Sequence, residues 1–174
     1  METREPVGSL YCLDTDLTVR KVLDKVTVSN GLAWSPDNTK MYYIDTATRK
    51  VVSFDYDLSS GNIKNKREVI SIPEDTGKPD GMTIDEDGML WIAHWGGYRV
   101  SRWNPKTGQL LQKVSVPAAQ TSSCVFGGQN RSELFITTAR TGLDQEELKK
   151  YPYSGGLFRV KTGVRGCPTY KFKG

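Results

Sequence analysis

One pattern occurs three times along this chain and limits the folds that it can adopt. Each copy has a pair of small or polar residues, a short apolar run, a polar turn and an aromatic-rich run. The copies begin at Ser29, Pro79 and Thr121. A repeat of about 40 to 50 residues is typical of folds built from several copies of one supersecondary unit. We therefore expect units that bury their apolar faces against one another.

Each unit has the pattern of four short antiparallel strands. After the first strands, the second strands are predicted at 41–45, 90–94 and 134–138, the third at 51–56, 99–103 and 156–160, and the fourth at 68–72 and 112–116. Four such strands in one repeat are typical of a blade of a β-propeller. The chain lacks helical heptads, which disfavours a helical solenoid. Core packing is favoured over a ligand platform for the tryptophans, because three of the four lie in or near strands whose large rings fill the space between blades: Trp34, Trp91, Trp95 and Trp103.

The two ends of the chain set the expected number of blades. Residues 9–13 and 19–26 match the third and fourth strands of a unit, so the chain is predicted to begin within a blade. One all-β domain, 1–174, is expected, a partial propeller of about three and a half blades. Its predicted parts are a half blade at 8–27 and blades at 28–78, 79–120 and 121–174. The exposed faces of an open stack favour self-association.

Two local features of the last unit complete the expected fold. A segment at 141–152 interrupts the repeat, and Asp144 is predicted to cap a short helix there, with Glu146 four residues before Lys150. One more strand is predicted at 168–172, after the last third strand, either as an outer strand of that blade or as a closing strand.

Composition narrows the possible partners. The chain has 24 Lys and Arg against 20 Asp and Glu, and the net charge of +4 is scattered rather than gathered in a stripe. A nucleic-acid partner is therefore not expected. The sequence lacks a run of about 18 apolar residues and an apolar core near Met1, so we expect a cytoplasmic protein without a membrane partner. Cys12, Cys124 and Cys167 are far apart and are expected to be free thiols.

Equivalent positions of the three repeats hold Asn30, Asp80 and Ser122. In a propeller, the residues that begin the innermost strands surround the central axis, so these side chains are expected to converge. Amide and carboxylate oxygens bind Ca²⁺, and they also serve Mg²⁺, Mn²⁺ or Zn²⁺. The alternative is that Asn30-Gly31 and Asp80-Gly81 are simply turn residues. Both pairs precede apolar runs instead of separating hairpin strands, which favours the ligand interpretation.

Two other polar features have simpler explanations. His94 is the only histidine of the chain, and it could act as an acid or base beside the channel. A strand histidine with satisfied hydrogen bonds is the favoured interpretation. The acidic run 85–88 fails the EF-hand pattern, which would place His94 at the position of the bidentate Glu, so a hairpin turn is predicted.

Several motifs in the same order resemble the regucalcin, gluconolactonase and luciferin-regenerating-enzyme family. They lie at 28–35, 42–45, 54–57, 79–82, 90–91, 126–128 and 160–166. The resemblance runs from about Gly8 to Gly174. It implies a six-bladed propeller with one divalent metal at its axis, held by a Glu, an Asn that matches Asn30 and an Asp that matches Asp80.

The resemblance also implies an activity. Asp80 would be the base that activates water for the opening of an aldonolactone, with Ca²⁺ or Zn²⁺, or else Mg²⁺ or Mn²⁺, as the cofactor. The Glu ligand, and the Arg and Asn that hold the sugar hydroxyls, would lie upstream of Met1. We therefore expect a sugar-lactone hydrolase in truncated form, with little activity of its own. The alternative is a non-catalytic calcium-binding or interaction protein, and these residues do not separate lactonase from luciferin-regenerating activity.

Overall fold

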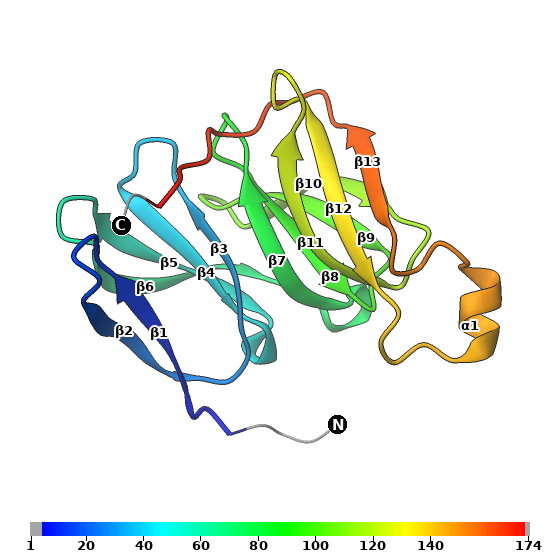
Figure 1. Cartoon of the computed structure of the whole chain (residues 1–174), viewed down its shortest axis with the longest axis horizontal. Coiled ribbons are helices and arrows are strands. Elements are labelled where there is room, and N and C mark those ends of the chain that lie inside the picture. The colour runs from blue at the N-terminus through cyan, green and yellow to red at the C-terminus, as the bar shows by residue number, and fades with distance from the viewer. Residues whose placement is uncertain (1–4, 173–174) are drawn as a thin grey trace.

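The computed structural model describes residues 5–172, which form a chain of short antiparallel strands (Figure 1). The strands are β1 (Gly8–Leu13), β2 (Val19–Val26), β3 (Ser29–Trp34), β4 (Lys40–Asp45), β5 (Lys50–Asp57), β6 (Asn62–Ser71), β7 (Lys78–Ile84), β8 (Leu90–Trp95), β9 (Arg99–Asn104), β10 (Gln109–Ser115), β11 (Gln120–Gly127), β12 (Glu133–Ala139) and β13 (Leu157–Lys161). Short 3-10 helices follow β4 (η1, Thr46–Thr48) and β6 (η2, Glu74–Thr76).

The strands pair in chain order. β1 and β2 form a two-stranded sheet, and β3 to β6 form a four-stranded meander. β7 to β10 and β11 to β13 are two further meanders, which a single pair of residues, Gln120 and Trp95, joins into one seven-stranded sheet. The predicted second, third and fourth strands of the repeats all occur. The division into blades at 28, 79 and 121 stays a prediction.

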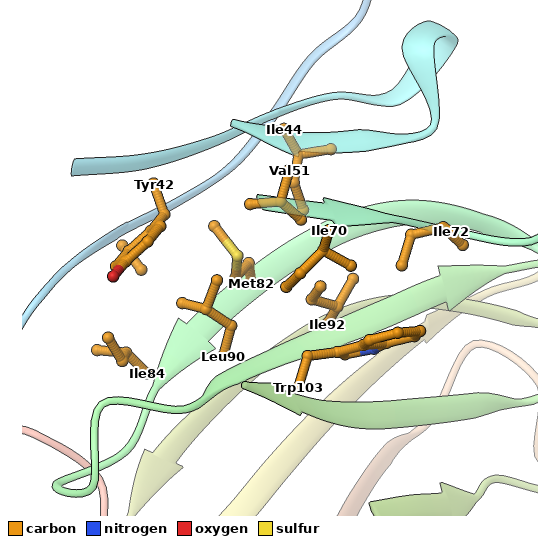
Figure 2. Close-up of a cluster of buried hydrophobic side chains, with 11 residues drawn as sticks. Tyr42, Ile44, Val51, Ile70, Ile72, Met82, Ile84, Leu90, Ile92 and Trp103 are labelled. Carbon is orange, nitrogen blue, oxygen red and sulfur yellow. The ribbon is translucent and has the colours of Figure 1, made fainter. Parts of the chain in front are cut away.

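The second strands of the first two meanders, β4 and β8, are buried on both faces, which explains their apolar runs. In β8, Leu90 and Ile92 face one core, whereas Trp91 and Ala93 face another. The first of these cores fills the space between the β3–β6 and β7–β10 sheets, where Ile44 and Val51 meet Leu90 and Ile92 (Figure 2). Side chains alternate between the two faces of a strand, so a strand between two cores, such as β8, contributes to both.

Two further cores repeat this arrangement on either side. One packs Trp91 and Val100 against Phe126 and Leu134, between the β7–β10 and β11–β13 meanders. The other packs Val26 against Tyr43 and its neighbours, between β1–β2 and the next sheet. Each sheet thus packs its face on the next one, as the predicted propeller requires.

The insertion after β12 contains a single turn of helix, α1 (Gln145–Lys150). Asp144 caps it as predicted, and its carboxylate accepts a hydrogen bond from the Glu147 amide, 2.8 Å. The ion pair of this helix joins Glu146 to Lys149 rather than to Lys150, and the Lys150 ammonium lies over the Tyr151 ring. Within the described residues, no helix is long and apolar enough to cross a membrane.

The prediction of a strand at 168–172 is wrong. The segment after β13 runs back across the molecule toward the β3–β6 sheet (Figure 1). Its backbone bonds to segments from two meanders: the Glu86 amide donates to the Arg165 carbonyl and the Gly166 amide to the Arg131 carbonyl. Because these contacts lead the chain away from β13, the segment does not add a strand beside it.

Candidate functional site

The first strand of each meander has an irregularity at the same place. In β3, the two residues between Ser29 and Leu32, Asn30 and Gly31, oppose the single residue Ile44 of β4. The same one-residue bulge lies between Pro79 and Met82 in β7, and between Thr121 and Ser123 in β11. Bulges bend a strand and change the direction of a side chain, and they are frequent beside active sites. The bulged positions include Asn30, Asp80 and Ser122, so the repeat equivalence predicted from the sequence holds in three dimensions.

Glycine next to the bulge lets neighbouring inner strands approach closely. A Cβ atom on Gly31 would lie 2.8 Å from the Asp80 carbonyl oxygen and 2.5 Å from the Cβ of Met82. A Cβ atom on Gly81 would lie 2.7 Å from the Cα of Ser123. Both glycines lie inside strands, and neither has a φ in the left-handed region. They serve close backbone contact rather than a hairpin turn.

This close approach brings the Asn30 and Asp80 side chains together. The Asn30 amide donates a hydrogen bond to the Asp80 carboxylate, and both residues are half-buried. Burial raises the pKa of Asp80, and the hydrogen bonds from Asn30 and the Gly81 amide oppose this increase. The pair is therefore a partly desolvated carboxylate beside an amide, which is a suitable start for a cation site.

Thr46, in the 3-10 helix after β4, connects the two strands. Its hydroxyl donates to the Pro79 carbonyl, 2.7 Å, and accepts from the Asn30 amide, 3.1 Å. Asp45 holds this helix in place, since its carboxylate accepts hydrogen bonds from the backbone amides of Thr27, Val28 and Ala47. Our sequence reasoning missed Thr46. The available signal was an Asp-Thr pair directly after a strand, where such side chains commonly bond to nearby backbone.

Ser122 does not join the pair. Its hydroxyl shares a 2.9 Å hydrogen bond with Thr137 of the neighbouring strand β12. Residues 5–172 bring together no group of three or more His, Cys, Asp and Glu side chains that could hold a metal ion. Asn30 and Asp80 suit a hard divalent cation, because both side chains offer oxygen atoms. Ca²⁺, for example, takes roughly six to eight oxygen ligands, which is more than these two residues provide. They fit as part of a metal site.

His94 is a buried strand residue whose ring nitrogens both have hydrogen-bond partners, as the favoured interpretation had it. It is 1% exposed, and its two ring nitrogens lie 2.9 Å from the Thr76 carbonyl and 2.5 Å from the Ser101 hydroxyl. The Trp103 indole donates to the same hydroxyl, 2.6 Å. Burial lowers the pKa of His94 to about 4, so the ring is neutral at pH 7. It ties the segment before β7 to β8, much as Asp45 ties the segment before β3 to β4.

The acidic run 85–88 is a hairpin turn between β7 and β8, as predicted. Asp85 is fully buried, and its carboxylate accepts hydrogen bonds from the Trp91 indole, 2.8 Å, and the Arg102 guanidinium, 2.7 Å. The carboxylate also accepts hydrogen bonds from the backbone amides of Asp87 and Met89. With these donors, Asp85 stabilises the turn and is not available to a cation.

An apolar pocket of about 690 Å³ lies at the other ends of the same inner strands. Trp34, Ile84 and Tyr170 are among its lining residues. Trp34 is 38% exposed there, whereas Trp91 and Trp103 are buried in the cores, as predicted for them. Asn30 and Asp80 lie near the beginnings of β3 and β7, so this pocket is separate from them.

Stacked antiparallel meanders with polar groups at the starts of their inner strands define a β-propeller type of protein. The chain belongs to the SMP-30/Gluconolactonase/LRE-like family, whose model matches residues 1–140. It is 46% identical to regucalcin of Oryctolagus cuniculus over 168 residues, which cover 96% of this chain and 56% of that protein. The chain thus spans little more than half the length of the curated relatives that it matches.

Two solved structures have the same fold. The chain matches a luciferin-regenerating enzyme with a TM-score of 0.85 and 41% identity, over 92% of this chain and 54% of the other. It matches a calcium-binding protein, regucalcin, from Agrobacterium tumefaciens with a TM-score of 0.91 and 27% identity, over 97% and 57% of the two chains. Both matches agree with the predicted all-β, partial-propeller fold and with the family resemblance.

Proposed function

We propose that Asn30 and Asp80 are two ligands of the divalent cation in a metal-dependent sugar-lactone hydrolase of the gluconolactonase type. The observation that carries the proposal is their contact: an amide and a carboxylate, from equivalent bulges of two neighbouring inner strands, share a hydrogen bond. Ca²⁺ or Zn²⁺ is the proposed ion, with Mg²⁺ and Mn²⁺ as further candidates. The family name supports a lactone as the substrate.

The roles of the two residues follow from their surroundings. A bound cation would polarise the lactone carbonyl and make a bound water more acidic. Asp80 would accept a proton from the attacking water, and its raised pKa brings it closer to the range useful for a base. The Asn30 carbonyl oxygen would help to hold the ion beside that carboxylate. In this proposal the remaining ligands and the groups that hold the sugar hydroxyls come from outside the 174 residues, so we expect little turnover by this chain alone.

Cation binding tests the two ligands directly. Isothermal titration calorimetry of the 174-residue chain with each of the four ions should show binding that Asn30→Ala and Asp80→Asn weaken by about 10-fold or more. Asp24→Asn is the matched control, because it removes an exposed carboxylate of β2. Equal affinity in the wild type, Asn30→Ala and Asp80→Asn would contradict the proposal.

Turnover of glucono-1,5-lactone, followed in a pH-stat, tests the expected activity. We expect at most weak, cation-dependent hydrolysis that Asp80→Ala abolishes. Strong turnover lost in Asp80→Ala would show that the two ligands suffice, against our expectation for this chain. Turnover that persists in Asp80→Ala would show that Asp80 is not the base in this reaction.

A second candidate is a non-catalytic calcium-binding or interaction protein. It is favoured by the small donor set, since residues 5–172 place no group of three or more His, Cys, Asp and Glu side chains around Asp80. Calcium binding that needs both residues, with no lactone turnover even at high protein concentration, would support it. In either case the protein is proposed to be cytoplasmic, without a nucleic-acid or membrane partner.

A further inference from the structure

Thr46 occupies an unusual position, because it touches both inner strands of the proposed site. It is the first residue of the 3-10 helix after β4, and its own amide donates to the Val28 carbonyl, 3.0 Å. Its hydroxyl contacts Asn30 of β3 on one side and the carbonyl of Pro79, the neighbour of Asp80, on the other. One side chain therefore sets the spacing between the two proposed ligands.

The hydrogen atoms in this network determine which way the Asn30 amide points. A threonine hydroxyl has one hydrogen, and the Pro79 carbonyl can only accept, so that hydrogen goes to Pro79. Thr46 Oγ1 can then only accept from Asn30, which places the NH₂ group of Asn30 beside it. The second N–H of that group serves the Asp80 carboxylate. The carbonyl oxygen Oδ1 is the Asn30 atom left for a cation.

We propose that Thr46 is a positioning residue of this site, which holds Asn30 with Oδ1 free for a cation and sets the distance between β3 and the Pro79–Asp80 segment. This inference rests on the proposed function of Asn30 and Asp80 as cation ligands. Without the hydroxyl, only the Asp80 carboxylate still holds the NH₂ group of Asn30, so the amide is less firmly oriented. Groups that orient metal ligands from outside the coordination shell typically change metal affinity by about 10- to 100-fold.

Two substitutions separate the hydroxyl from the shape of the side chain. Thr46→Val keeps the branched shape and removes both hydrogen bonds, whereas Thr46→Ser keeps the hydroxyl. Calorimetry with Ca²⁺ and with Zn²⁺ should show affinity reduced about 10- to 100-fold in Thr46→Val and within about 3-fold of the wild type in Thr46→Ser. Thermal unfolding of both variants checks that they are folded, and Thr46→Ala provides a second hydroxyl-free variant.

A readout without metal follows the amide itself. The side-chain NH₂ signals of Asn30, assigned by their loss in Asn30→Ala, should exchange faster with water in Thr46→Val than in the wild type or Thr46→Ser. Unchanged cation affinity and amide exchange in Thr46→Val, with affinity lost in Asn30→Ala and Asp80→Asn, would overturn the role of Thr46 and leave the proposed function intact. Absent cation binding, or binding indifferent to Asn30→Ala and Asp80→Asn, would overturn both.

Discussion

Single residues of this chain owe their roles to hydrogen-bond partners that lie far away in the sequence. His94 and Asp45 hold equivalent places at the ends of β8 and β4, and each binds the backbone that precedes an inner strand. Unlike the Asp45 carboxylate, the His94 imidazole gains a charge when it binds a proton, and its burial disfavours that charged form. Titration of His94 is therefore linked to folding.

Acid should destabilise the chain through His94. The pKa of His94 is about 4 in the folded state and 6.5 when unperturbed. As the pH falls between these values, the unfolded state binds a proton that the folded state does not, so stability is lost as the pH decreases. The loss is about 3 kcal/mol, at about 1.4 kcal/mol for each pKa unit.

Chemical unfolding at pH 7, 5 and 4 measures this loss. His94→Asn keeps a donor for the Thr76 carbonyl but does not titrate in this range, so its stability should fall less between pH 7 and 4 than that of the wild type. The other titrating groups are common to both proteins and cancel in the difference. If the free energies of unfolding of the two proteins fell in parallel with pH, His94 would not be the source of the acid destabilisation.

At the scale of elements, the inner strands combine a bulge with an adjacent close contact. Gly31 brings β3 against β7, and Gly81 brings β7 against β11. The bulge sets the direction of Asn30 or Asp80, and the glycine sets how near the next strand can lie. We expect that neither β3 nor β7 would hold its proposed cation ligand, Asn30 or Asp80, in place if the contact were lost.

Gly81→Ala should destabilise the chain by about 1 to 3 kcal/mol, as expected for overpacking. The added Cβ would lie 2.6 Å from the Cβ and 2.7 Å from the Cα of Ser123. In a double-mutant cycle, Ser123→Gly should recover part of the loss by removing the first contact but not the second. The free energies of unfolding of the wild type, the two single variants and the double variant provide the test. Strict additivity of the two effects would mean that residues 81 and 123 do not clash in Gly81→Ala.

At the scale of the whole molecule, the stack of sheets is open at both ends. The outer face of β11–β13 carries Val125 and Leu157, which are 48% and 67% exposed. At the other end, β1 and β2 expose Tyr11, Leu13 and Val19. Among the described strands, β1 pairs only with β2 and β13 only with β12, so each keeps a free edge. Exposed apolar faces and free edges favour contact with another copy of the chain.

We expect the purified chain to self-associate with rising concentration in sedimentation velocity experiments. Leu157→Lys should shift the distribution toward the monomer, because it places a charge on the exposed apolar face of β11–β13. Leu58→Lys is the control, since Leu58 is 65% exposed but lies in the turn after β5, outside these faces. A chain that stays monomeric at every concentration, or equal effects of the two substitutions, would exclude these faces as the contact.

The sequence by itself determined the strands of the repeats, their turns and the helix cap, because each depends on residues within a few positions of one another. Repeated aromatic-rich runs predicted β4 and β8, the polar run 85–88 predicted the hairpin, and Asp144 predicted the start of α1. The repeat also placed Asn30 and Asp80 at equivalent positions before any contact was known.

Only the tertiary structure decided what these positions meet. The contact of Asn30 with Asp80 and the bridging role of Thr46 depend on how closely two inner strands approach, and local sequence does not contain that distance. The path of residues 168–172 also follows from long-range hydrogen bonds near Glu86 and Arg131 rather than from the strand propensity of the segment. Short-range preferences thus built the elements, and packing between sheets built the site.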